Sequence, residues 1–109
     1  MEIEKSTNTT VELSNEAKNE YLKSLMSKMY KILHLIEEES ETGFSPIPFI
    51  EGRLTELNSA NDMFHGRLVN IIIKLNAIKN NYGTMSFQDC KSQIFEIRKI
   101  ITAIQKELR

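Results

Sequence analysis

Apolar residues recur along most of the chain at alternating spacings of three and four positions. This is the period of an amphipathic helix that packs against other helices. The first series predicts a helix over residues 15–39. It consists of Leu22, Leu25, Met29, Ile32 and Ile36. Ser14 or Asn15 can cap its start, because either side chain accepts a hydrogen bond from a free N–H of the first turn. Gly43 can take the left-handed conformation that ends a helix.

The second series is the longest and predicts a helix over residues 48–82. It consists of Ile50, Leu54, Leu57, Asn61, Phe64, Leu68, Ile71, Leu75, Ile78 and Tyr82, with Asn61 as the polar member. We favour one continuous helix, because the spacing keeps its phase across residues 58–62 and a loop has no reason to preserve it. The alternative is a break in this run of weak helix formers, where Asn61 or Asp62 caps a new helix that opens toward Phe64.

The third series predicts a helix over residues 87–108. It consists of Phe87, Cys90, Ile94, Ile97, Ile101, Ile104 and Leu108. Ser86 and Asp89 resemble a capping box, with Asp in place of the usual Glu. Short links between successive helices imply antiparallel neighbours. The sequence therefore predicts an all-α fold, with three heptad-patterned helices in an antiparallel bundle or coiled coil. This domain spans residues 14–109 and follows a flexible arm over residues 1–13.

The unequal lengths of the predicted helices bear on the oligomeric state. The helix over residues 48–82 extends well beyond the shorter helix over residues 87–108, which leaves part of its apolar stripe uncovered. A second copy of the chain is the commonest cover for such a stripe, so we expect a homo-oligomer. A buried Asn in the stripe would fix the register of that contact. The residues expected at the oligomer or partner interface are Leu54, Leu57, Asn61, Phe64 and Leu68.

Charge and composition narrow the classes of partner. The 109-residue chain has 14 basic and 15 acidic residues and a formal net charge of −1. Binding to nucleic acid or to an anionic membrane surface requires a positive excess, so we expect neither. The longest apolar stretch, Leu68–Leu75, is too short to cross a bilayer. The single cysteine, Cys90, and the lack of an apolar leader favour a reducing, cytoplasmic location.

The residue types that usually carry catalysis or bind metals are few and scattered. His34 and His65 lack the neighbouring Cys or His residues of a zinc site. Cys90 falls within an apolar stripe, so we expect a buried small hydrophobe rather than a nucleophile. The four glycines form no phosphate-binding loop. The sequence predicts a protein that is not an enzyme and uses no cofactor.

Two groups of charged residues are candidates for partner recognition. Arg53, Arg67 and Lys74 flank the apolar stripe of the helix over residues 48–82, where charges set pairing between helices. We favour ion pairs within the bundle, and the alternatives are a surface for a partner or a site for a small phosphorylated ligand. Four glutamates within residues 37–41 gather where the helix dipole disfavours negative charge. We favour a solvated helix end, and the alternatives are docking on a basic partner surface or repulsion that blocks a wrong pairing.

The segment over residues 48–58 resembles small coiled-coil accessory proteins encoded by bacteriophages. The resemblance rests on the phrases Arg53-Leu54-x-x-Leu57-Asn58 and Arg67-Leu68-x-x-Ile71. It implies a phage or mobile-element protein that blocks or regulates a host factor. It assigns no functional residue.

These observations predict a non-enzymatic helical interaction protein that associates with itself. It would bind or inhibit a partner protein, or hold a small ligand between its helices. The alternative is a monomeric regulatory bundle similar to bacteriocin immunity proteins.

Overall fold

The computed structural model describes residues 13–108, so residues 1–12 of the predicted arm and Arg109 lie outside the described residues. The described residues form four α-helices, α1 (Asn15–Thr42), α2 (Ile47–Ala60), α3 (Val69–Asn81) and α4 (Phe87–Glu107). Two short 3-10 helices, η2 (Asn61–Phe64) and η3 (Tyr82–Thr84), lie between them. The prediction of an all-α fold is confirmed, and the predicted count of three helices is wrong.

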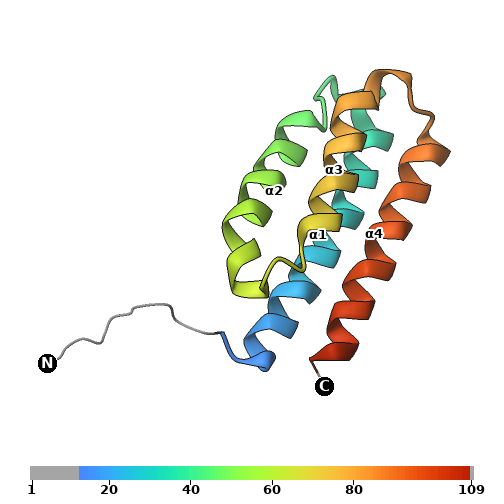
Figure 1. Cartoon of the computed structure of the whole chain (residues 1–109). Coiled ribbons are helices and arrows are strands. Elements are labelled where there is room, and N and C mark those ends of the chain that lie inside the picture. The colour runs from blue at the N-terminus through green and yellow to red at the C-terminus, as the bar shows by residue number, and fades with distance from the viewer. Residues whose placement is uncertain (1–12, 109) are drawn as a thin grey trace, which may run out of the picture.

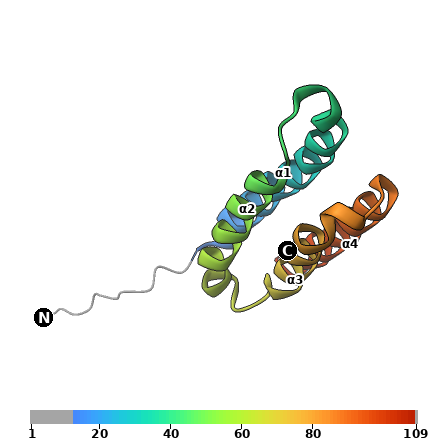
Figure 2. The ribbon, with the colours of Figure 1, turned by 90° about the horizontal axis from the view of Figure 1, so that it is seen from above.

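Consecutive helices run in opposite directions, and α4 returns to lie beside α1 (Figure 1). The chain therefore forms an up-down-up-down bundle. Seen from above, the successive pairs α1–α2 and α3–α4, which we name the two hairpins, lie on opposite sides of the bundle (Figure 2). The closest helix packing is between α1 and α4, between α3 and α4 and between α2 and α3. The two ends of the described chain lie together, and the Asn15 side chain donates a hydrogen bond to the Leu108 carbonyl oxygen.

The ends of α1 and the start of α4 follow the capping signals in the sequence. The Ser14 hydroxyl accepts a hydrogen bond from the Ala17 N–H at 3.0 Å. Gly43 adopts φ +76° and its N–H donates to the Glu39 carbonyl, so α1 continues to Thr42, beyond the predicted end at residue 39. A capping box of Ser86 and Asp89 opens α4. Each cap satisfies N–H groups or carbonyls that have no partner within the helix.

The predicted continuous helix over residues 48–82 is wrong. The α-helix ends at Ala60, and after η2 the chain turns through His65 at φ +53° and Gly66 at φ +81°. The left-handed conformation has no steric cost at glycine, and two such residues in succession cannot belong to an α-helix. The Asn61 side-chain oxygen accepts a hydrogen bond from the Leu68 N–H at 3.0 Å, which satisfies a donor at the start of α3.

The alternative of a broken helix is therefore nearer to the structure, but it differs in detail. The alternative predicted a new helix that starts just after Asn61 or Asp62, whereas α3 begins at Val69. Asn61 spans the turn to Leu68 instead of capping a helix that starts at its own position. Gly83, just after the predicted end of this helix at residue 82, lies within η3 and has no positive φ.

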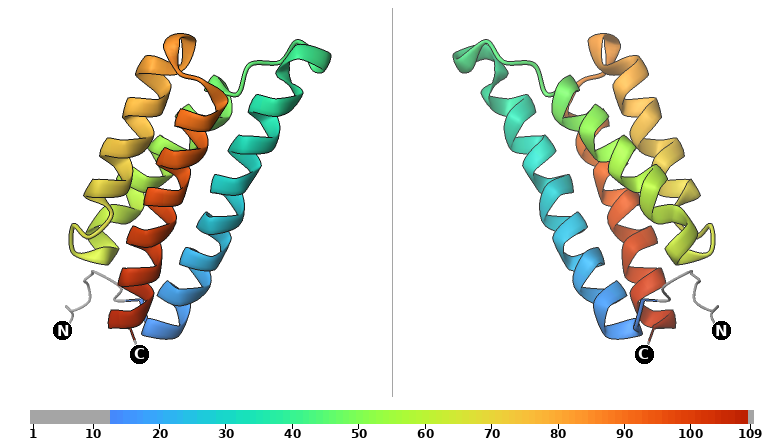
Figure 3. Two further views of the ribbon diagram at one scale, coloured as in Figure 1. Left: turned by 90° about the vertical axis from the view of Figure 1, so that its right-hand side faces the viewer. Right: turned by 90° about the vertical axis from the view of Figure 1, so that its left-hand side faces the viewer.

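The hydrophobic core lies between the four helices and includes every apolar member of the long series from residue 50 to residue 78. Helix α2 folds back beside α3 (Figure 3), and the apolar residues of both halves of this series are buried in the same core. The uncovered stripe on which the homo-oligomer prediction rests is therefore absent from the described residues. Within residues 13–108, no helix has the length and apolar character that crossing a bilayer requires.

Candidate functional site

The residues predicted at an oligomer interface lie inside the bundle. Leu57 and Leu68 are fully buried, and Leu54 and Phe64 are 6% and 3% exposed. The Phe64 ring packs against Tyr21 of α1, with 5.5 Å between ring centroids. Asn61 is half-buried in the turn. In the folded chain these four apolar side chains pack within its own core.

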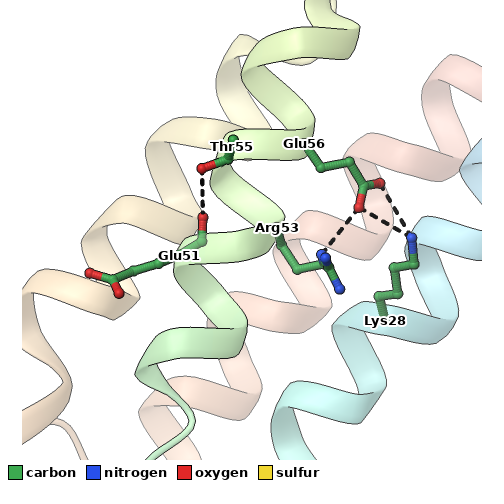
Figure 4. Close-up of polar contacts among 5 residues, drawn as sticks. All are labelled: Lys28, Glu51, Arg53, Thr55 and Glu56. Atoms are coloured by element: carbon green, nitrogen blue, oxygen red, sulfur yellow. Dashed lines mark hydrogen bonds and ion pairs between the residues drawn. The ribbon is translucent and has the colours of Figure 1, made fainter.

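Arg53 belongs to a polar cluster between α1 and α2, which Figure 4 shows. Its Nε lies 3.1 Å from the Glu56 Oε1, and its guanidinium stacks over the Phe49 ring at 4.7 Å from the centroid. Lys28 reaches across from α1 and its Nζ donates to both carboxylate oxygens of Glu56, at 3.2 and 3.4 Å. Glu56 thus pairs with both Lys28 and Arg53. Arg53 therefore forms an ion pair within the bundle, which is the interpretation we favoured from the sequence.

Tyr21 completes this cluster from the α1 side. Its hydroxyl is buried and forms no hydrogen bond of normal geometry with the residues that the structure describes. Burial raises the pKa of the Tyr21 phenol, and the neighbouring Glu56 carboxylate raises it further. Tyr21 therefore keeps its proton at neutral pH. Because Lys28 and Arg53 both pair with Glu56, the cluster acts as a polar clamp between α1 and α2.

The three basic residues predicted to form one stripe are separated by the turn. Arg53 lies on α2, Arg67 in the α2–α3 turn and Lys74 on α3. Arg67 makes a bidentate ion pair with Glu107 at the end of α4. That hydrogen bond lowers the pKa of Glu107 and raises the pKa of Arg67. Lys74 forms no ion pair with a carboxylate in residues 13–108. The stripe therefore exists only on the continuous helix that the chain does not form.

The histidines and the cysteine lie apart from one another. His34 is exposed and its Nδ1 lies 3.9 Å from Glu37, and His65 occupies the α2–α3 turn. Cys90 is buried in the core, where burial raises the pKa of its thiol and the Asp89 charge adds to the effect. A raised pKa keeps the thiol protonated and unreactive at neutral pH. The described part of the chain holds no group of three or more potential metal ligands.

The two hairpins differ sharply in charge. Residues 13–62 contain nine acidic and five basic residues, a formal charge of −4. Residues 63–108 contain three acidic and seven basic residues, a formal charge of +4. Each acid of the second hairpin is engaged, Asp89 in the capping box, Glu96 with Lys99 and Glu107 with Arg67. The α3–α4 hairpin therefore presents a surplus of cations without a carboxylate partner among the described residues.

A shallow hollow lies on the outer side of α4. Its volume is about 600 Å³, and it is lined by Phe95, Arg98, Lys99, Thr102, Ala103 and Lys106. Thr102 and Ala103 are short, so the helix surface drops where they stand among the longer side chains. Three of the six lining residues carry positive charge, and the Phe95 ring is 38% exposed, with the Lys91 Nζ 5.8 Å from its centroid. The hollow thus has an apolar base and a basic rim.

The most exposed of the large apolar side chains described is Phe44, which lies in the link between α1 and α2. Phe44 is 76% exposed in the α1–α2 link, residues 43–46, which we name the Phe44 loop. Its N–H donates to the Thr42 hydroxyl and the Ile47 N–H donates to the Ser45 hydroxyl, both at 3.1 Å. The exposed glutamates Glu37, Glu38 and Glu41 stand just before it. The loop holds an aromatic ring in solvent beside an acidic surface.

The sequence identified the glutamates of residues 37–41 as a candidate surface for a basic partner, but it predicted neither the exposure of Phe44 nor the hollow on α4. The net charge of −1 gives no sign that the two hairpins carry opposite charges, although the sequence has no acidic residue between Asp62 and Asp89. Phe44 stands in a link between two helices, where the apolar spacing gives no information on burial. The signal that was available is the contrast in charge between the two halves of the chain.

No family model, curated protein or solved structure matches this chain.

Proposed function

We propose that the protein is a non-enzymatic helical interaction protein that associates with itself and binds a protein partner through the outer surface of its bundle. The observation that carries the proposal is the 76% exposure of Phe44 in a link with hydrogen bonds on both sides. Leaving a large apolar side chain in water forgoes about 1.5–3 kcal/mol of burial. Exposed aromatic side chains of this kind commonly anchor protein interfaces.

The charge division supports the same proposal. A surface of one sign attracts partners of the other sign and speeds their encounter. This chain presents both signs, −4 over residues 13–62 and +4 over residues 63–108, on two hairpins that share one core. A second copy is therefore an electrostatically suitable partner. A host protein is the further partner that the resemblance to phage accessory proteins implies.

Sedimentation equilibrium over a range of micromolar concentrations tests this proposal. We expect a mass above the 12.6 kDa of one chain at low salt and a shift toward 12.6 kDa at high salt, because salt screens attraction between exposed charges. A mass of 12.6 kDa at every protein concentration in low salt would contradict the self-association.

A further inference from the structure

We infer that the Phe44 loop of one copy docks into the hollow on α4 of a second copy. This inference rests on the proposed self-association and identifies the two surfaces that make it. Phe44 is 76% exposed and follows the exposed glutamates Glu37, Glu38 and Glu41. The hollow joins the half-exposed Phe95 ring and two short side chains to the cations of Arg98, Lys99 and Lys106. The two surfaces carry opposite charges, and each has an exposed aromatic ring.

The size of the hollow suits the proposed occupant. A volume of about 600 Å³ lies within the range of sites that hold small organic ligands, so it accepts one phenyl side chain and the adjacent backbone. Phe95 provides an aromatic partner for an inserted ring, and aromatic pairs favour tilted or offset contact. Docking would bury both rings and bring three carboxylates to the basic rim.

The contact requires two molecules. The Phe44 loop lies at the end of the bundle where α1 meets α2, whereas the hollow runs along α4 toward the end where the chain leaves the bundle (Figure 1). The exposure of Phe44 shows that residues 13–108 of its own chain leave the ring uncovered. The contact joins two different patches, the Phe44 loop of one copy and the hollow of another. Two copies that make this contact in both directions form a closed symmetric dimer. Copies that make it in one direction only extend into a larger assembly.

The strongest single test is a Phe44→Ala variant with Ile73→Ala as its control. Ile73 is also a large exposed apolar residue, 59% exposed on the outer side of α3 and outside both surfaces. Both variants should fold as the parent does, which circular dichroism and a thermal melt will check. We expect Phe44→Ala to weaken the self-association constant about ten- to a hundredfold, from the loss of one buried aromatic side chain. Ile73→Ala should leave it unchanged.

A pair of charge variants tests the other surface. Arg98→Glu with Lys106→Glu reverses two charges of the hollow, and Lys74→Glu with Lys79→Glu makes the same change of charge on α3. We expect the first variant to be monomeric at concentrations at which the second still associates. Sedimentation equilibrium measures all four variants beside the parent chain.

The outcomes separate the two proposals. A parent chain that is monomeric throughout would overturn both the self-association and the docking. A parent chain that associates, with Phe44→Ala or the hollow variant associating equally well, would overturn the docking and leave the self-association standing. An equal loss in the variants and in their controls would show a non-specific charge or apolar effect and would also overturn the docking.

Discussion

The two hairpins of this bundle bury the same kind of side chain and expose opposite charges. Leucine, isoleucine and methionine from α1–α2 meet isoleucine and leucine from α3–α4 in one core. Outside it, the first hairpin carries a formal −4 and the second +4. The comparison shows that core pattern and surface charge are independent, because each helix turns one face inward and another outward. A chain of nearly zero net charge can therefore present two strongly charged surfaces.

The first prediction breaks the junction between the hairpins and has the largest expected effect. Leu68 is fully buried where the α2–α3 turn enters α3, and Leu68→Asp would place an unpaired charge in the core. We expect a loss of more than about 3 kcal/mol in unfolding free energy, enough to unfold many domains of this size. Denaturant titration measures the loss.

The adjacent residue provides the control for this change. Val69 is 46% exposed at the first position of α3, where the helix dipole favours a negative charge. Val69→Asp should change the unfolding free energy by less than about 0.5 kcal/mol. Equal losses in the two variants would show that the inward face of α3 is misplaced.

The second prediction concerns Asn61, whose side chain joins the two halves of the turn. Asn61→Leu removes the acceptor of the Leu68 N–H and should lower the unfolding free energy by about 1–2 kcal/mol. Asn61→Asp keeps an oxygen acceptor at this position and should lose less. A rise in melting temperature for Asn61→Leu would instead support the continuous helix, in which Asn61 lies in an apolar seam.

The third prediction uses two glycines from the region predicted to be one helix. Gly66 adopts φ +81°, so Gly66→Ala should destabilise the fold by about 1–2 kcal/mol through a left-handed alanine. Gly52 lies within α2, and a Cβ added there meets no atom within 4 Å. Gly52→Ala should therefore stabilise the fold by up to about 1 kcal/mol. Thermal melts of both variants should shift in opposite directions, and shifts of the same sign would contradict the turn.

The fourth prediction, with the smallest expected effect, concerns a contact between the hairpins. The Tyr82 hydroxyl of η3 donates a hydrogen bond to a Glu39 carboxylate oxygen of α1, and burial together with that carboxylate raises the pKa of Tyr82 to about 12. The ordinary pKa is about 10, so the folded state favours the neutral phenol. This stabilisation is complete below about pH 10 and is lost as the pH rises toward about 12.

Replacing the phenol tests this dependence. We expect Tyr82→Phe to be slightly less stable than the parent chain below pH 10, and the difference to shrink between about pH 10 and pH 12. Denaturant titrations of both proteins across this interval measure the difference. A constant difference over the whole interval would show that Tyr82 titrates alike in the folded and unfolded chains.

The sequence predicted α1 and α4 because their stop and start signals are local. Ser14, Gly43, Ser86 and Asp89 each act on a backbone group within a few residues, so their effect can be read without the rest of the fold. It mispredicted residues 48–82 because α2 and α3 face the same core. A helical hairpin that keeps its apolar phase through the turn has the same spacing as one long helix.

The candidate surfaces were harder to predict for a different reason. The burial of Arg53 against Phe49 and Glu56 depends on local spacing, and the expected pairing within the bundle was accordingly found. The exposure of Phe44 depends on what the remaining helices leave uncovered. The hollow on α4 depends on which short residues fall on its outer side. Neither is contained in the spacing of apolar residues.

The central claim is that the Phe44 loop, together with the glutamates that precede it, and the basic hollow recognise each other between copies. Mixing two charge-reversed variants tests it most directly. One variant carries Glu37→Lys, Glu38→Lys and Glu41→Lys, and the other carries Arg98→Glu, Lys99→Glu and Lys106→Glu. Each variant then has matching charges on both surfaces, whereas the lysines of the first complement the glutamates of the second.

We predict that each variant alone sediments as a 12.6 kDa monomer at low salt and that the equimolar mixture forms a heavier complex. A mixture that remains monomeric in a buffer in which the parent chain associates would contradict the claim.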